Sequence, residues 1–154
     1  MILVRSPHDL RFLEMLSGSY LRLLGTPLPT AGLSGHAASR WLYEDAPFCL
    51  LAHDTSPDPL FCYANRAAQR RFEYSWDEFV GMPSRLSAEA PNRDERHTFM
   101  QRVRRYGFSE DYSGVRVTKS GRRFRIEQAV VWNVLDRDTN IHGQAAMFGG
   151  WTDL

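Results

Sequence analysis

Residues 61–68 read Phe61-Cys62-Tyr63-Ala64-Asn65-Arg66-Ala67-Ala68 and mark a change from strand to helix. The aromatic residues in the first half of this stretch favour a strand. Asn65 is a favourable N-cap, because its side-chain oxygen can accept a hydrogen bond from the first turn of a helix. We therefore predict a strand at residues 60–63 and a helix that starts after Asn65 and continues to Phe72.

A second strand and a short helix are predicted just before this stretch. Phe48–His53 is another apolar run, and the turn-forming residues 54–59 that follow it predict a hairpin. Residues 35–45 predict a short helix that stops before Pro47, since the backbone before a proline disfavours the helical conformation.

The start of the chain predicts an amphipathic helix at residues 6–25. Its apolar residues recur at helical spacing, and Ser6 is placed to cap it. A linker with two prolines follows, so we expect residues 1–34 to form a helix-and-linker segment and residues 35–154 to form the main domain. The apolar face of such a helix must be buried, either against a partner or against the sheet of its own chain.

The second half of the chain predicts two more helical segments and then three strands. Residues 75–79 favour a helical turn, and residues 93–106 favour a longer helix. Strands are predicted at residues 111–118, 122–135 and 141–151. The order of elements predicts an α+β fold, with a five-stranded antiparallel sheet, helices on one face and the additional N-terminal amphipathic helix.

Three details of this half are also predicted. In strand 111–118, Val115 and Val117 lie on one face, and Arg116 and Thr118 lie on the other. Residues 129–132 break the alternation of their strand, which indicates a bulge or a strand covered on both faces. The arginines of the long helix are expected to face water. They are Arg96, Arg102, Arg104 and Arg105.

Composition restricts the class of protein. The chain is 43% hydrophobic, and its formal net charge of +1 creates no field that would attract nucleic acid or an anionic membrane. No apolar run approaches the roughly 18 residues of a spanning helix, and no signal peptide is recognisable, so we expect a cytoplasmic protein. Cys49 and Cys62 are then expected to be reduced, buried thiols, with a redox pair as the alternative.

The order of elements resembles the PAS architecture. Residues 61–68 resemble the PAS strand and Asn-x-Ala-Ala helix start, and Lys119-Ser120-Gly121-Arg122-Arg123-Phe124 resembles the PAS turn between the third and fourth strands. Blocks in a fixed order over nearly the whole chain after the linker resemble one branch, the MEKHLA domain family. These blocks are Ala46-Pro47-Phe48, His53, Asp58-Pro59, Tyr63–Ala68, Phe72-Glu73, Pro83–Glu89, Arg93, Glu95-Arg96, Asp111–Arg116, Ser120–Phe124, Val131-Trp132-Asn133 and Gly143–Ala146.

The resemblance implies a PAS-like sensory or interaction domain. MEKHLA domains occur at the C-terminus of plant class III homeodomain–leucine-zipper transcription factors and as small free-standing proteins, which this chain resembles. No homeodomain or leucine-zipper heptad is found in these 154 residues, so we expect no nucleic-acid partner and no membrane partner. The family transfers no catalytic residue to this chain.

Better-known PAS domains hold a flavin or a haem through particular residues. The flavin-attacking cysteine of light-sensing PAS domains is replaced here by Ser84, and a hydroxyl is a much weaker nucleophile than a thiolate. Non-covalent flavin stays an alternative, with Gln144 as a contact or as an ordinary strand amide. His97 lies on the helix that carries the haem ligand in haem-binding PAS domains, but its charged neighbours predict a solvated side chain. No histidine spacing predicts a metal site. We expect no cofactor.

We therefore expect a non-catalytic sensory module that binds a small ligand or a partner protein. A small enzyme is the alternative, but no Gly-x-Ser-x-Gly element is present. We expect a homodimer or a partner protein at the N-terminal helix and the sheet face. Gly114 weakens a strand interior, which predicts a close approach there and destabilisation by Gly114→Val. The ligand-pocket candidates, which core packing explains equally well, are Leu50, Phe61, Met82, Leu86, Phe99, Val103, Val115, Val117, Ile126, Gln144, Ala145 and Met147.

Overall fold

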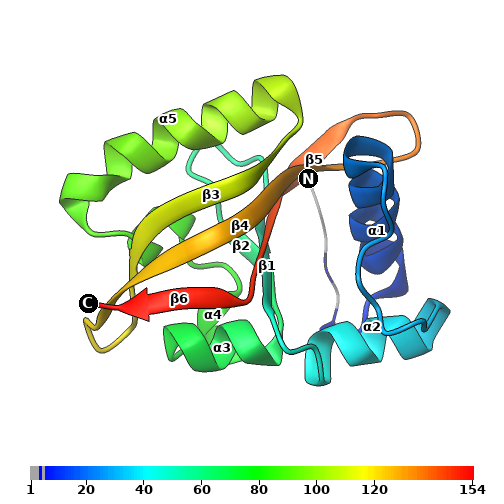
Figure 1. Cartoon of the computed structure of the whole chain (residues 1–154), viewed down its shortest axis with the longest axis horizontal. Helices are drawn as coiled ribbons and strands as arrows, with labels where there is room; N and C mark the ends of the chain where they lie inside the picture. The colour runs from blue at the N-terminus through cyan, green and yellow to red at the C-terminus, as the bar shows by residue number, and fades with distance from the viewer. Residues whose placement is uncertain (1–3, 5) are drawn as a thin grey trace.

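The computed structural model describes residue 4 and residues 6–154, and an antiparallel sheet crosses the middle of the molecule (Figure 1). The strand order is β2-β1-β5-β4-β3, and β6 also pairs with β4. The expected strand at 141–151 is interrupted at Gly149, so the sheet has six strands where the sequence predicts five. The strands are β1 (Cys49–His53), β2 (Phe61–Ala64), β3 (Phe108–Val117), β4 (Arg123–Leu135), β5 (Ile141–Phe148) and β6 (Gly150–Asp153).

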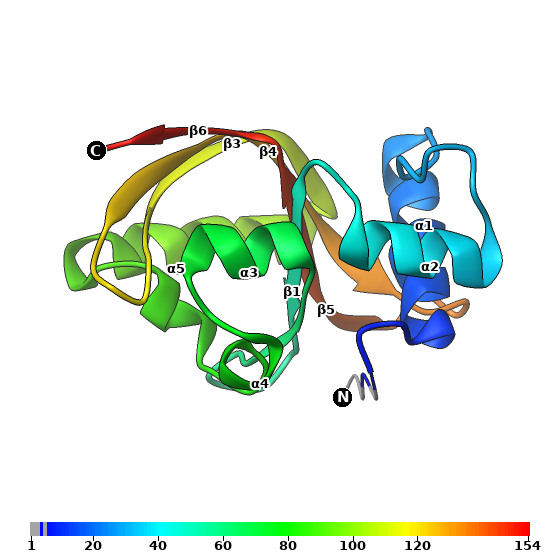
Figure 2. The same ribbon diagram turned by 90° about the horizontal axis from the view of Figure 1, so that it is seen from below.

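Helices cover both faces of the sheet. Figure 2 shows α1 and α2 on one side of β1 and β5, with α3 and α5 on the other. The α+β PAS-like architecture is thus confirmed, but α2 lies on the side of the N-terminal helix and not on the face that carries α3 and α5. No described helix is both long and apolar enough to cross a membrane. The helices are α1 (Leu10–Leu24), α2 (Gly35–Glu44), α3 (Arg66–Phe72), α4 (Trp76–Phe79) and α5 (Ala90–Tyr106), with a 3₁₀ turn at Ser84–Ser87.

Asn65 fixes the junction between β2 and α3. Its Oδ1 accepts the backbone N–H groups of Ala68 and Leu50, each at 3.0 Å. Its Nδ2 donates to the carbonyl oxygens of Leu42 at 2.9 Å and Phe48 at 3.0 Å. The side chain is fully buried, so these four bonds satisfy an amide that would otherwise destabilise the fold. The predicted cap therefore also ties α2, β1 and α3 together.

Helix α1 starts later than the sequence suggests. Asp9 is its N-cap and accepts the N–H of Phe12 at 3.1 Å, so Ser6 is not the cap as predicted. A carboxylate at this position pairs a free N–H and also complements the positive end of the helix dipole. Gly25 ends the helix in the left-handed conformation.

The apolar face of α1 is buried against the sheet of its own chain. Phe12, Leu16 and Tyr20 are buried in one hydrophobic cluster with Trp132 of β4. The indole Nε1 of Trp132 also donates to Ser19 Oγ at 3.2 Å. The structure thus shows the alternative in which the helix folds back, and this apolar face is not free to receive a partner.

Strand β4 is covered on both of its faces. Ala129 belongs to the cluster beneath α3, whereas Trp132 and Val134 belong to the cluster beneath α1. Gln128 has a φ of 51°, and the pairing of β3 with β4 shifts register opposite this region. The irregular run 129–132 therefore reflects both of the predicted causes, a bulge and double coverage.

Candidate functional site

A small cavity lies between the sheet and α5. Its volume is about 40 Å³. We call it the inner cavity, and its wall combines apolar side chains from the sheet with buried polar side chains from α5, β3 and the β1–β5 pair. Its lining residues are Leu51, Ala52, His53, Phe61, Phe72, Ser87, Arg96, Met100, Tyr112, Arg116, Ile126, Ala129, Val131, Gln144, Ala145, Ala146 and Phe148.

Arg96 of α5 lies on the cavity wall and does not face water as the sequence suggests. Its side chain is only 9% exposed, and Nε is buried without a hydrogen-bond partner among the described residues. Burial lowers the pKa of Arg96 to about 10, and the positive charge of Arg116 acts in the same direction. Because this pKa is still far above neutral pH, the cavity wall carries a full positive charge.

Arg116 of β3 supplies a second buried guanidinium. It is 5% exposed, Nη1 donates to the Val115 carbonyl oxygen at 2.9 Å, and Nη2 donates to Tyr112 Oη at 2.7 Å. The inward face of β3 carries Arg116 and Thr118, while Val115 and Val117 are only partly buried. Periodicity separates the two faces of a strand correctly, but the face that α5 covers is the polar one.

His53 and Gln144 are cross-strand neighbours of β1 and β5 on the same wall. His53 Nδ1 lies 3.0 Å from the Asp54 carbonyl oxygen, and the opposite nitrogen, Nε2, is buried without a partner. Burial lowers the pKa of His53 to about 4, which keeps the ring neutral at pH 7. A neutral ring that donates through Nδ1 presents Nε2 to the cavity as a hydrogen-bond acceptor.

Gln144 connects α5 with the sheet. Its Nε2 donates to the Met100 carbonyl oxygen at 2.8 Å and to Asn133 Oδ1 at 3.3 Å. Asn133 Nδ2 in turn donates to the Arg104 carbonyl oxygen at 3.1 Å. The Oε1 atom of Gln144 is buried and has no partner among the described residues, so one acceptor of this connection is left for the cavity.

A larger hollow of about 310 Å³ adjoins the inner cavity. We call it the outer hollow. It lies between the loop that follows β1, the second half of α5 and the start of β5, and it shares His53, Met100 and Gln144 with the inner cavity. These three residues therefore lie between the inner cavity and the outer hollow. Since methionine has a flexible side chain, Met100 is the most easily moved part of this barrier.

The predicted pocket residues are divided between several places. Phe61, Ile126, Gln144 and Ala145 line the inner cavity. Leu50 and Met147 instead pack with the cluster beneath α1. The rest lie around the cavity or further out: Met82 packs on the cluster beneath α3, Leu86 is 37% exposed, Phe99 stacks on Tyr112, Val103 is buried in α5, and Val115 and Val117 are partly buried in β3.

The polar residues of the inner cavity wall were not predicted from the sequence. Arg96, Tyr112 and Arg116 lie in blocks that resemble the family, but they were not predicted to line a site, because charged side chains usually face solvent. One signal was present in the alternation of β3, where Tyr112, Gly114 and Arg116 share a face. The position of α5 over that face is a tertiary feature that the alternation does not contain.

A flavin or a haem does not fit the inner cavity in this structure. Small-molecule sites usually measure roughly 300–1,000 Å³, which far exceeds about 40 Å³. Ser84, at the position of the flavin-attacking cysteine, is buried outside the lining of this cavity. His97 is exposed and lines the outer hollow. Within the described residues, no three His, Cys, Asp or Glu side chains are grouped to hold a metal ion.

The two cysteines lie in different hydrophobic clusters. Cys49 belongs to the cluster beneath α3, and Cys62 belongs to the cluster beneath α1, so the sheet separates them. Burial raises the pKa of each thiol to about 12. They are free thiols without the proximity that a redox pair requires.

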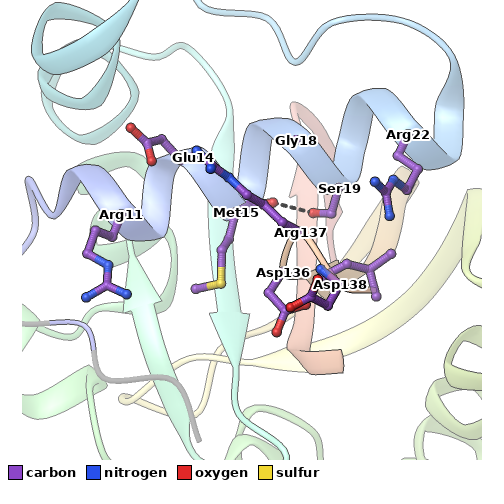
Figure 3. A pocket seen from close by; sticks show the side chains of 10 residues that line it. Arg11, Glu14, Met15, Gly18, Ser19, Arg22, Asp136, Arg137 and Asp138 are labelled. Atoms are coloured by element: carbon purple, nitrogen blue, oxygen red, sulfur yellow. Dashed lines mark hydrogen bonds between the residues drawn. The ribbon is translucent and has the colours of Figure 1, made fainter. Parts of the chain in front are cut away.

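A third hollow, of about 640 Å³, lies on the opposite side of the molecule between α1 and the turn that joins β4 to β5 (Figure 3). Charged groups of both signs line it, including Arg11 and Glu14 of α1 and Asp136 and Arg137 of the turn. Asp136 Oδ2 is hydrogen-bonded there to His142 Nε2 at 2.8 Å. Because these charges balance and are open to water, this hollow has none of the unpaired buried groups of the inner cavity.

Comparison with solved structures identifies the fold. The PAS domain of a Colwellia psychrerythraea protein matches 71% of this chain and 87% of that chain, with a TM-score of 0.54 and 16% identity. The LOV protein of Rhodobacter sphaeroides matches 75% of this chain and 64% of that chain, with a TM-score of 0.59 and 14% identity. A fungal LOV domain photoreceptor matches 90% of this chain and 91% of that chain, with a TM-score of 0.57 and 20% identity. At these identities the likeness shows the PAS fold alone.

Comparison by sequence identifies the family. The homeobox-leucine zipper protein ATHB-14 of Arabidopsis thaliana is 26% identical over 152 residues, which are 96% of this chain. REVOLUTA of the same plant is 26% identical over 155 residues. The chain spans only 18% of the length of each of these relatives. The family model of the MEKHLA domain matches residues 10–153, which include α1, and the chain therefore belongs to the MEKHLA domain family.

Proposed function

We propose that this chain is a non-catalytic sensory module that binds a small ligand in the inner cavity and admits it through the outer hollow. The PAS-like fold and the MEKHLA match support a sensory signalling role. The observation that carries the proposal is a set of buried polar atoms without partners, namely Arg96 Nε, His53 Nε2 and Gln144 Oε1. Each such atom costs about 1–3 kcal/mol, and a ligand that pairs with them removes that cost.

The cavity is also placed to pass on a signal. Gln144 holds the carbonyl oxygen of Met100 in α5 and the side chain of Asn133 in β4. The residue before Asn133, Trp132, is hydrogen-bonded to Ser19 of α1 on the far side of the sheet. A ligand that pulls on Gln144 thereby acts on α5 directly and on α1 through one strand.

The experiment is a nuclear magnetic resonance titration with a library of small polar fragments. We expect a binding fragment to shift the backbone amides of His53, Met100 and Gln144 together. Ala146→Leu places a larger side chain in the inner cavity and should abolish these shifts, whereas Ala37→Leu on the exposed side of α2 should leave them unchanged. Shifts that survive Ala146→Leu would place the binding elsewhere and refute the proposal.

A partner-binding role is a second proposal, supported by one uncovered part of the sheet. All four residues of β6 are exposed, and Trp151 in this strand is 39% exposed. Exposed aromatic residues are enriched at protein interfaces. If this surface joins two copies of the chain, light scattering should give the mass of a dimer for the native chain and of a monomer for Trp151→Glu. A native monomer at high concentration contradicts self-association.

A further inference from the structure

Two buried arginines share the inner cavity without an acidic partner. Neither Arg96 nor Arg116 forms an ion pair with any carboxylate of the described residues. Acidic residues of neighbouring segments are engaged elsewhere, since Glu89 pairs with Arg123 at 2.5 Å and Asp54 accepts backbone N–H groups. A positive charge withdrawn from water is strongly destabilising unless an anion compensates it. An anion that compensates these two charges would therefore come from outside the described chain.

The arginine side of the cavity offers several free donors. Arg96 Nε–H has no partner. Arg116 uses one N–H of Nη1 and one of Nη2 within the protein, and each of these nitrogens carries a second N–H. Tyr112 accepts from Arg116, and its own O–H has no acceptor in the part of the chain that the structure describes. These donors suit the two oxygens of a carboxylate, which guanidinium groups bind with matching planar geometry.

The opposite side of the cavity offers acceptors instead. His53 Nε2 is an acceptor, because Nδ1 must carry the proton that it donates to the Asp54 carbonyl oxygen. Gln144 Oε1 is also an acceptor. The two side chains lie close enough to interact, but neither buried atom makes a hydrogen bond of good geometry. A ligand that fits this side must therefore carry a hydrogen-bond donor a short distance from its anionic group.

The size and the remaining wall restrict the ligand further. A volume of about 40 Å³ is far below the roughly 300–1,000 Å³ of sites for drug-sized ligands, so only a very small ligand fits. The aromatic rings of Phe61 and Phe148 and the side chain of Ile126 form an apolar part of the wall. A short hydrocarbon group is favoured there over a fully hydrated inorganic ion.

We infer that the inner cavity takes a compact hydroxycarboxylate of the size of glycolate or lactate. Its carboxylate lies between Arg96 and Arg116, and its hydroxyl group donates to His53 or Gln144. A hydroxyl is favoured over an ammonium group because the two arginines already place two positive charges in the cavity, which an anion partly neutralises and a zwitterion does not. The inference rests on the proposed function, since it names the ligand of the same cavity.

Isothermal titration calorimetry with four probes tests this inference. Lactate is compared with propionate, which lacks the hydroxyl, with alanine, which replaces it by an ammonium group, and with inorganic phosphate. We expect lactate to bind at least about tenfold more tightly than each of the others, since a hydrogen bond to a buried or charged group is worth about 1.5–3 kcal/mol, or tenfold and more.

Variants of the cavity wall test which residue binds the carboxylate and which binds the hydroxyl group. Arg96→Met should weaken lactate at least tenfold and yet fold at least as stably as the native chain, because it removes an unpaired buried charge. Gln144→Leu should bring the affinities for lactate and propionate close together. Arg102→Met, on the exposed side of the same helix, is the matched control and should bind lactate as the native chain does.

The outcomes separate the inference from the proposed function. Undiminished binding of lactate by Arg96→Met, or tighter binding of alanine or phosphate than of lactate, overturns the hydroxycarboxylate. If none of the four probes binds while uncharged fragments still shift the amides of His53, Met100 and Gln144, the inference fails and the proposed function stands. If neither the probes nor the fragments act on these amides, both fail.

Discussion

Replacing Gly114 with alanine should destabilise the fold by displacing Tyr112. A Cβ at position 114 would lie 2.3 Å from Tyr112 Oη and 2.8 Å from Cζ, so the ring must move. The movement breaks the hydrogen bond to Arg116, worth about 1.5–3 kcal/mol, and the stacking of Tyr112 on Phe99, worth about 0.5–1.5 kcal/mol. Alanine recovers about 0.5–1 kcal/mol because glycine has more freedom in the unfolded chain. The net loss is about 2 kcal/mol.

Urea denaturation measures this loss as a change in the free energy of unfolding. The control is the same substitution in a Tyr112→Ala background, where no ring meets the new Cβ. There Gly114→Ala should be neutral or stabilising, because the φ of Gly114 lies outside the left-handed region and suits alanine. An equal loss in both backgrounds, or a native-background variant as stable as the parent, would refute the steric argument.

Three other predictions concern buried polar groups. Because the pKa of His53 is lowered to about 4 in the folded chain from 6.5, the unfolded state binds the extra proton between these values. The free energy of unfolding should thus fall by up to about 3 kcal/mol as the pH drops from 6.5 to 4, a fall that a His53→Gln variant should lack in pH-dependent urea titrations. Cys49 and Cys62 should react with a thiol reagent only after unfolding, because burial raises both pKa values to about 12; rapid reaction of the native chain would contradict the buried placement. Ser19→Ala removes the acceptor of the Trp132 indole and should cost about 1 kcal/mol in thermal unfolding, with no loss meaning that water replaces the bond.

The elements that the sequence predicted are those with local signals. The sequence around Asn65 predicts the end of a strand, a helix cap and the start of a helix within a few residues. The structure has the end of β2, the cap and the start of α3 at this place. Gly25 ends α1 as predicted, since only local backbone geometry decides it. Ser6 was predicted as the cap of α1, but Asp9 caps the helix instead, three residues later in the chain. The split of the last strand at Gly149 depends on pairing with β4, which is a long-range feature.

The candidate site was less accessible because its polar residues look like surface residues. Alternation in β3 separates Val115 from Arg116 but does not say which one faces α5. Hydrophobic preference favours the valine, and the structure places the arginine inside. An arginine that faces inward where a valine is expected requires the rest of the fold to hold a charged side chain out of water.

That reversal is itself the argument for a ligand. If the inner cavity served only to complete the core, apolar residues of similar size at positions 96 and 116 would fill it at lower cost than two arginines without an acidic partner. The unpaired acceptors of His53 and Gln144 face the same space, and Gln144 connects that space to α5 and β4. A packing defect has no reason to gather donors on one side and acceptors on the other beside the hydrogen bonds that join α5 to the sheet. A site whose occupancy alters those bonds has such a reason, because the binding free energy is then coupled to the position of α5.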